Sequence, residues 1–271
     1  TSIVKKLVDS NFKVNTFSVI IKNNKYNEKK YIDQVVNKYK TNHHEVFVDE
    51  NISNNVIMSA ISSLDEPYAD PSVVPSYYLS KLISSKYKVA ISGDGGDELL
   101  GGYFRIKNHL NKKNIINNKI SHLYSIYPAF LGSGTKLKSK SRDISESYLA
   151  FLEDEKFHSY VTQKNLSTDL RMKVNNIGPV YKSLLGAEYK YYLSDQMMFK
   201  VDRSSMSNSL EVRSPFVDHK LIEYIFSHSS EYFNNKQKYP LYKFLSDDFD
   251  RGFLDRPKQG FVFDYKNWIF S

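Results

Sequence analysis

The stretch "YKVAISGDGGDELLGGYFR", residues Tyr87–Arg105, runs from strand-forming residues into a turn that combines five glycines with three acidic residues. Lys88–Ser92 is predicted to be a strand, because it is short, largely apolar and bounded by turn residues. Ligands of open α/β proteins bind beyond the carboxyl ends of such strands, so this turn is a candidate site. Its carboxylates would repel a phosphate group unless a divalent cation lay between the two.

Two known glycine-rich templates do not fit this turn. A dinucleotide-binding fingerprint that starts at Gly93 requires glycine at its sixth position, where this chain has Glu98. A calcium loop that starts at Asp94 requires an oxygen ligand where the chain has Gly96, and glycine where it has Leu99. The turn therefore supplies carboxylates without either fold-specific pattern.

The spacing of the acids leaves two interpretations open. In the first, Asp97 is a magnesium ligand beside phosphate oxygens, and Asp94 stays available to accept a proton. In the second, Asp94 is an ordinary turn residue and Asp97 is the N-cap of a helix that starts at Glu98 to Leu100. Residue types alone do not decide between them.

The chain before this turn alternates between helical and strand patterns. Apolar spacing predicts helices over residues 1–10, 28–39, 54–64 and 74–87, and strands over Val14–Ile21 and residues 43–49. Strands separated by helices of this length indicate an α/β fold with a parallel sheet and flanking helices. We expect one domain over residues 1–271, with an α/β nucleotide-binding part at 1–106.

The chain after this part has a different character. Strand signals fade from about Lys107, and helical spacing recurs in "SYLAFLED", "EYKYYLSDQMMFKVDR" and "HKLIEYIFS". Residues 107–271 are therefore predicted to be mostly helical, with a mobile polar loop at Leu131–Asp143.

Composition narrows the classes of partner. The 271 residues carry a net charge of +8, but the basic residues are spread along the chain with acids between them, so we expect no nucleic-acid partner. No apolar run approaches the roughly 20 residues that cross a bilayer, so no membrane contact is expected. The absence of cysteine excludes disulfides, thiolate metal sites and a cysteine nucleophile. Without a leader-like start, the expected location is cytoplasmic.

Several other polar or sulfur-containing residues are assigned structural roles. Adjacent His43 and His44 would point to opposite faces of a strand, so they are not expected to share a metal. Met197 and Met198 are expected in the core. The acids of two proline-set loops either line a pocket or act as caps and turns: Asp65, Glu66 and Asp70. A charge-dense segment is expected to form a buried ion-pair network: Arg203, Glu211, Arg213 and Asp218.

Four blocks of the sequence resemble the synthetase domain of glutamine-hydrolysing asparagine synthetases. In order, they are "DEPYADPSVVPSYYLSKL" (Asp65–Leu82), "SGDGGDELLGGY" (Ser92–Tyr103), "VDRSSMSNSLEVRSPFVDHKLIEY" (Val201–Tyr224) and "DRPKQGF" (Asp255–Phe261). The resemblance implies an adenine nucleotide alpha hydrolase-like fold of the ATP pyrophosphatase type. It also implies that aspartate attacks the α-phosphorus of ATP to give β-aspartyl-AMP, and that ammonia from glutamine then displaces AMP.

The same resemblance implies roles for individual residues. Ser92 and Gly93 would hold the adenosine part of ATP, and Val19 would present its backbone to the adenine. Asp97 would help to hold Mg²⁺, with Glu98 grouped beside it among the nucleotide-binding positions. Two residues would be catalytic: Asp94, near the acyl-adenylate, and Lys258, facing the phosphates. A metal and a lysine aimed at the phosphates would stabilise the charge that develops there.

Two parts of that family's enzymes are not in this sequence. The pyrophosphate-binding loop is expected just before Thr1, and a glutaminase domain with an N-terminal cysteine is expected further upstream in the same full-length chain. We therefore expect a fragment of a longer enzyme that has little synthetase activity by itself; a homodimer stays open. The alternatives are a related adenylating amidotransferase or cyclase with another carboxylate acceptor, and a catalytically silent scaffold or basic nucleic-acid binder.

Overall fold

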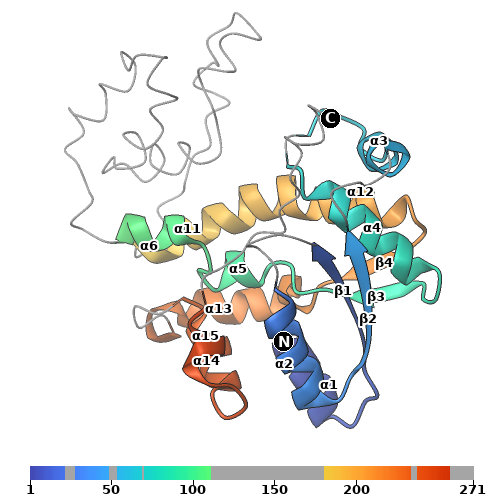
Figure 1. The fold of residues 1–271 in the computed structure, drawn as a ribbon. Helices are drawn as coiled ribbons and strands as arrows, with labels where there is room; N and C mark the ends of the chain where they lie inside the picture. The colour runs from blue at the N-terminus through green and yellow to red at the C-terminus, as the bar shows by residue number, and fades with distance from the viewer. Residues whose placement is uncertain (22–27, 49–53, 69, 111–179, 233–236, 257–271) are drawn as a thin grey trace, which may run out of the picture. The chain divides into compact units, whose positions relative to one another are not determined.

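A computed structural model describes residues 1–21, 28–48, 54–68, 70–110, 180–232 and 237–256 (Figure 1). The chain forms two compact units that interleave in sequence. Unit 1 comprises residues 1–94, 196–218 and 240–271, and unit 2 comprises residues 95–195 and 219–239. The expected division at residues 106 and 107 stays a prediction.

The strands of unit 1 are short and parallel, as the helix–strand alternation predicted. β1 (Asn15–Ile21) pairs with β2 (Asn42–Val48), with Val19 opposite Val46, and β3 (Val89–Ile91) pairs with β4 (Glu211–Arg213), with Ala90 opposite Val212. The two pairs are separate sheets among the described residues, whereas the helix–strand alternation suggested one sheet. β4 was not predicted, because two of its three residues are charged and exposed.

The predicted helices of the first half are all present, with ends that differ by a few residues. They are α1 (Ser2–Asp9), α2 (Lys29–Tyr39), α3 (Asn54–Ser62) and α4 (Val73–Ser84). α4 packs on β1, β2 and α3, and also on α12 (Phe199–Met206), which in turn contacts β4 (Figure 1). A buried cluster between α3 and α4 forms a core: Ile57, Ala60, Val73 and Val74. The contact between α4 and α12 thus links the helices that pack on the two strand pairs.

Asp248 ties the start of the chain to its C-terminal part. Its carboxylate accepts from Lys5 Nζ at 2.5 Å and from Tyr39 Oη at 2.9 Å, and it lies 3.2 Å from Lys38 Nζ. The hydrogen bond from Lys5 is the main reason that the pKa of Asp248 falls to about 2. Asp248 lies between α14 (Tyr239–Leu245) and α15 (Arg251–Leu254). One carboxylate therefore connects α1 and α2 to this region.

The described part of unit 2 is helical, which confirms the helical character expected after Lys107. Its helices are α5 (Gly96–Leu99), α6 (Phe104–Leu110), α11 (Val180–Ala187) and α13 (His219–Tyr232). Ile106, Leu184, Leu185 and Ala187 form its buried cluster. The π-helix η5 (Glu188–Met198) follows α11, and the chain passes from unit 2 into unit 1 between its residues Asp195 and Gln196. The "SYLAFLED" segment and the predicted loop at 131–143 lie outside the described residues.

A search of the described residues for membrane-crossing segments found no helix with the length and apolar character required.

Candidate functional site

The glycine-acid turn begins directly after β3, as predicted. The Ser92 amide donates to the Arg213 carbonyl at 2.9 Å, which extends the ladder between β3 and β4 by one bond. The Ser92 hydroxyl oxygen is buried and has no hydrogen-bond partner among the residues that the structure describes. Gly93 is exposed, and a side-chain carbon placed there would meet nothing within 4 Å. The turn thus opens with a buried polar atom and an accessible stretch of backbone.

Asp94 is held through its backbone by a residue that follows β4. Ser214 directly follows β4, and its hydroxyl donates a short hydrogen bond to the Asp94 carbonyl oxygen. Gly95 then takes a left-handed conformation with φ 85°, which glycine adopts without the steric penalty of a side chain. Ser214 is a positioning residue that the sequence did not reveal, because it lies 120 residues further along the chain.

The structure contradicts the N-cap interpretation of Asp97. α5 begins at Gly96 and its N-cap is Gly95, so Asp97 lies inside the first turn of the helix. Its Oδ1 atom is 2.7 Å from the ammonium of Lys238, and its carbonyl accepts from the Gly102 amide at 2.8 Å. Because Gly95 is left-handed, α5 begins two residues earlier than the N-cap interpretation predicted, and the Asp97 side chain does not cap the helix.

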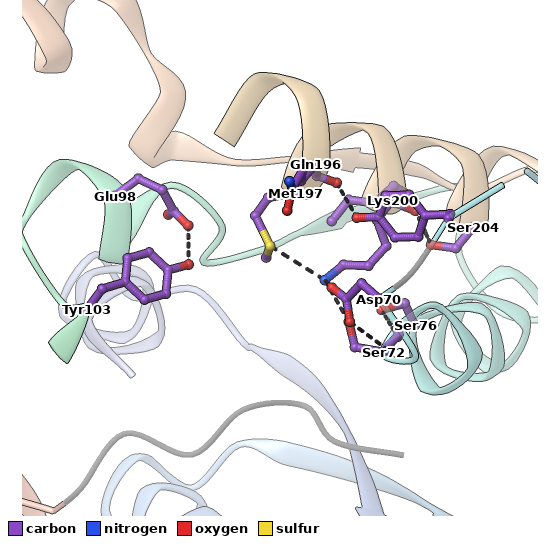
Figure 2. A network of polar contacts seen from close by, with 11 residues as sticks. Asp70, Ser72, Ser76, Glu98, Tyr103, Gln196, Met197, Lys200 and Ser204 are labelled. Carbon is purple, nitrogen blue, oxygen red and sulfur yellow. Dashed lines mark hydrogen bonds and ion pairs between the residues drawn. The ribbon is translucent and has the colours of Figure 1, made fainter. Parts of the chain in front are cut away.

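Glu98 is buried and accepts a short hydrogen bond from the Tyr103 hydroxyl, as Figure 2 shows. Burial, and then the nearby Glu98 charge, raise the pKa of the Tyr103 hydroxyl, so it remains a donor at neutral pH. This contact braces α5 against the chain that follows it. The assignment of Glu98 to nucleotide binding stays a prediction.

Arg105, which is partly buried, forms an ion pair with the fully buried Glu188 in the same unit. Arg105 donates to both carboxylate oxygens of Glu188 at 2.5 Å, and the Glu188 side chain is 0% exposed. The guanidinium carbon lies 4.0 Å from the ring centroid of Tyr103 and 4.3 Å from that of Tyr192. These two cation–π contacts hold the guanidinium beside the Glu188 carboxylate, to which it donates two hydrogen bonds. The pair therefore supports the tyrosine that contacts Glu98.

Lys200 joins the "ADPS" loop to α12 in unit 1. Its ammonium lies 3.0 Å from Asp70 Oδ2, 2.8 Å from Ser72 Oγ and 3.6 Å from Met197 Sδ (Figure 2). Burial by itself would raise the pKa of Asp70, but the Lys200 charge and the Ser72 hydrogen bonds hold that pKa below its usual value. Asp70 Oδ1 also accepts a hydrogen bond from the Ser72 amide at 2.9 Å. Asp70 therefore acts as a turn residue, which was one of the two predicted alternatives.

The predicted buried ion-pair network around "SPF" is wrong for three of its members. Arg203 pairs with Asp65 at 2.7 Å, and Arg213 pairs with Glu211 at 2.8 Å, as two separate contacts. All four side chains are exposed, and Glu211 and Arg213 are so because the short strand β4 leaves its charged residues on the surface. These residues form ordinary surface pairs.

The remaining predicted residues are placed as follows. Val19 lies in the middle of β1, and Lys258 lies outside the described residues. On β2, His43 Nδ1 lies 2.8 Å from Thr16 Oγ1, while the His44 ring stacks on Phe17 with centroids 4.9 Å apart. The two histidines therefore point apart, as predicted. Met197 and Met198 are half-buried rather than fully in the core.

The donor set around Asp97 fits a magnesium ion shared with phosphate oxygens. The described residues contain no group of three or more His, Cys, Asp or Glu side chains that could hold a metal by themselves. Magnesium at a nucleotide site needs only one or two carboxylates, because phosphates and waters supply the other ligands. Asp97 Oδ1 already has a cation, the Lys238 ammonium, at 2.7 Å. Asp97 Oδ1 therefore accepts a cation in this structure, and a magnesium ion would compete with the ammonium for the same oxygen.

Comparison with known proteins places the whole chain beside one family. The asparagine synthase family model matches residues 1–271. The glutamine-hydrolysing asparagine synthetase 1 of Bacillus subtilis is 25% identical over 233 residues, which cover 79% of this chain and 37% of that protein. A Methanocaldococcus jannaschii protein, provisionally named as a synthetase of the same type, is 39% identical over 99 residues, 36% of this chain and 18% of that protein. The chain thus spans well under half the length of these relatives.

Proposed function

This chain belongs to the asparagine synthase family, and we propose that it carries the ATP-dependent step of asparagine synthesis within a longer enzyme. The side-chain carboxylate of aspartate attacks the α-phosphorus of ATP, and β-aspartyl-AMP and pyrophosphate form. Ammonia, which a glutaminase domain of the same full-length chain releases from glutamine, then attacks the acyl carbon and displaces AMP. The observation that carries the proposal is the family match over the whole chain together with the turn that follows β3.

The first part of this turn suits the nucleoside end of ATP. A buried hydroxyl without a partner among the described residues, at Ser92, costs free energy until a ligand group bonds to it. The open space around Gly93 lets a ligand approach the backbone closely. We assign both residues to the adenosine part of ATP, with Val19 offering backbone groups to the adenine in a fold of the ATP pyrophosphatase type.

The acids of the turn divide the chemistry between them. Asp97 would hold a magnesium ion, which, when bound, neutralises charge on the phosphates as pyrophosphate departs. Asp94 would accept a proton from the attacking ammonia, and Ser214 keeps the backbone of Asp94 in place for this. Lys258 would face the phosphates from a segment outside the described residues. Glu98 would support Asp97 through its contact with Tyr103.

The test uses the full-length protein with aspartate, ATP, magnesium and ammonium, and measures AMP, pyrophosphate and asparagine. We expect Asp97→Ala to abolish formation of all three products. Asp94→Asn should retain pyrophosphate release while asparagine falls by about 10²-fold or more, the usual contribution of a general base. Asp33→Asn, on the exposed face of α2, is the matched control and should behave as wild type.

Failure of the folded full-length protein to form asparagine from the supplied aspartate would reject the proposed substrate. Loss of asparagine synthesis in the Asp33→Asn control, or normal synthesis by Asp97→Ala, would reject the assigned roles.

A further inference from the structure

Lys238 places an ammonium beside the carboxylate of Asp97. The Lys238 ammonium lies 2.7 Å from Asp97 Oδ1, and the two side chains are 37% and 24% exposed. Lys238 precedes α14 and belongs to the same compact unit as α5. It was not among the residues that the sequence singled out, because its segment has no distinctive pattern.

The backbone holds both ends of this pair. The Lys238 amide donates to the Leu100 carbonyl at 3.0 Å, and the Gln237 side-chain amide donates to the Gly102 carbonyl at 3.3 Å. Lys238 itself is left-handed, with φ 51°, a conformation that is unfavourable for a residue with a side chain. The chain thus accepts local strain at the residue that carries the ammonium to Asp97.

Gly102 makes room for the pair. A side-chain carbon at this position would overlap Asp97 Oδ1 and Lys238 Cε, so both side chains would have to move to admit one. The glycine, the strained lysine and the two hydrogen bonds together define a built contact. Surface ion pairs that form by chance do not require such support.

We propose that Lys238 is a resident counter-cation of Asp97, which occupies the position of the divalent ion before nucleotide binds and sets the metal concentration that the enzyme requires. The proposal rests on the role assigned to Asp97 above. A magnesium ion about 2.1 Å from the same oxygen would lie close to the ammonium, and the two cations repel. Lys238 must therefore withdraw as the ion enters. Its flexible stem and partial exposure allow this movement.

A counter-cation at this position has a physical use. A partly buried carboxylate without a positive partner repels the nucleotide phosphates and disfavours its own ionised state. Lys238 keeps the Asp97 charge compensated while the site waits for substrate. The cost is competition, because each divalent ion that binds must first overcome the ion pair.

The experiment measures metal affinity directly in the full-length protein. Free Mn²⁺, a spectroscopic substitute for Mg²⁺, is followed by electron paramagnetic resonance in wild type, Lys238→Met and Lys238→Gln. We expect both variants to bind Mn²⁺ about 3- to 5-fold more tightly, the range that a partly exposed ion pair can oppose, and added KCl to narrow the difference. Lys238→Arg keeps the charge and should stay near the wild-type affinity.

Lys29→Met is the matched control, because it removes one positive charge from a lysine of similar exposure that pairs with Asp33 and Glu45. Unchanged or weaker Mn²⁺ binding in both neutral Lys238 variants, or an equal gain in Lys29→Met, would overturn the proposal. Asp97→Asn tests the premise separately: if it binds Mn²⁺ as wild type does, the metal role of Asp97 fails whatever Lys238 does. Asparagine formation by wild type reports on the proposed function independently of these affinities.

Discussion

Replacing Glu188 by glutamine is predicted to be among the most destabilising single changes that preserve side-chain shape. The Glu188 carboxylate is 0% exposed and pairs through both oxygens with Arg105, whose side chain is 16% exposed. Breaking a buried ion pair from one side costs about 3–5 kcal/mol, mainly because the remaining charge loses its partner. Arg105 keeps some contact with water and makes cation–π contacts with Tyr103 and Tyr192, so we expect about 3 kcal/mol.

The assay is urea unfolding of the full-length protein, followed by circular dichroism and by tyrosine fluorescence. A loss of about 3 kcal/mol moves the unfolding midpoint down by roughly 1 M urea for a slope of about 3 kcal/mol/M. Glu211→Gln is the matched control, because its pair with Arg213 is 53% and 67% exposed and should contribute no more than about 1 kcal/mol.

A double variant separates the lost charge from the lost packing. Glu188→Leu combined with Arg105→Met removes both charges and keeps apolar volume, so it should be less destabilising than Glu188→Gln alone. The reasoning fails if Glu188→Gln and Glu211→Gln shift the midpoint equally, or if the double variant loses the sum of the two single effects.

Two further predictions concern unit 1. Lys5 lowers the pKa of Asp248 to about 2 from its usual value near 3.8, so the contact stabilises the fold above about pH 4 and is lost as the pH falls through 2. The difference in unfolding free energy between wild type and Asp248→Asn should therefore shrink by on the order of 1 kcal/mol over this range. A difference that does not change with pH would contradict this prediction. Lys200→Met removes the buried ammonium beside Asp70, so the pKa of Asp70 should rise. The melting temperature should fall by a few degrees, which corresponds to a loss of about 2 kcal/mol in unfolding free energy. If the titration of Asp70, followed by NMR, is unchanged in this variant, Lys200 does not set the charge of Asp70.

The elements whose signals are local were predictable from the sequence. Apolar alternation located β1 and β2, helical spacing located α2 and α4, and a short apolar run before glycines located β3. Each signal depends on the side chains of one segment, because burial of apolar surface is the main force that stabilises the folded chain. The glycine-acid turn was found for the same reason.

Two predictions were wrong because each depended on a backbone conformation or a contact between distant residues, which the spacing of residues within one segment does not indicate. The alternative in which Asp97 is an N-cap failed because Gly95 adopts φ 85° and starts α5 earlier. The predicted buried network failed because Arg213 and Glu211 lie on the exposed side of β4, a strand that forms only where β3 offers its edge. A strand of three residues is too short to show an alternation of polar and apolar side chains, so β4 could not be predicted from its sequence.

Residue spacing along the chain was enough to establish the α/β character of the first half, the helical character of the described second half, and the position of the acids after β3. The side chains that contact those acids were identified only from the tertiary structure. Ser214 donates to the Asp94 carbonyl, Lys238 pairs with the Asp97 carboxylate, and Tyr103 donates to Glu98. Arg105, which pairs with Glu188, supports Tyr103. The first two of these partners, and Glu188, come from segments far along the chain. Their pairing depends on how the fold brings those segments together, and a hydrogen bond between distant residues leaves no trace in the spacing of either segment.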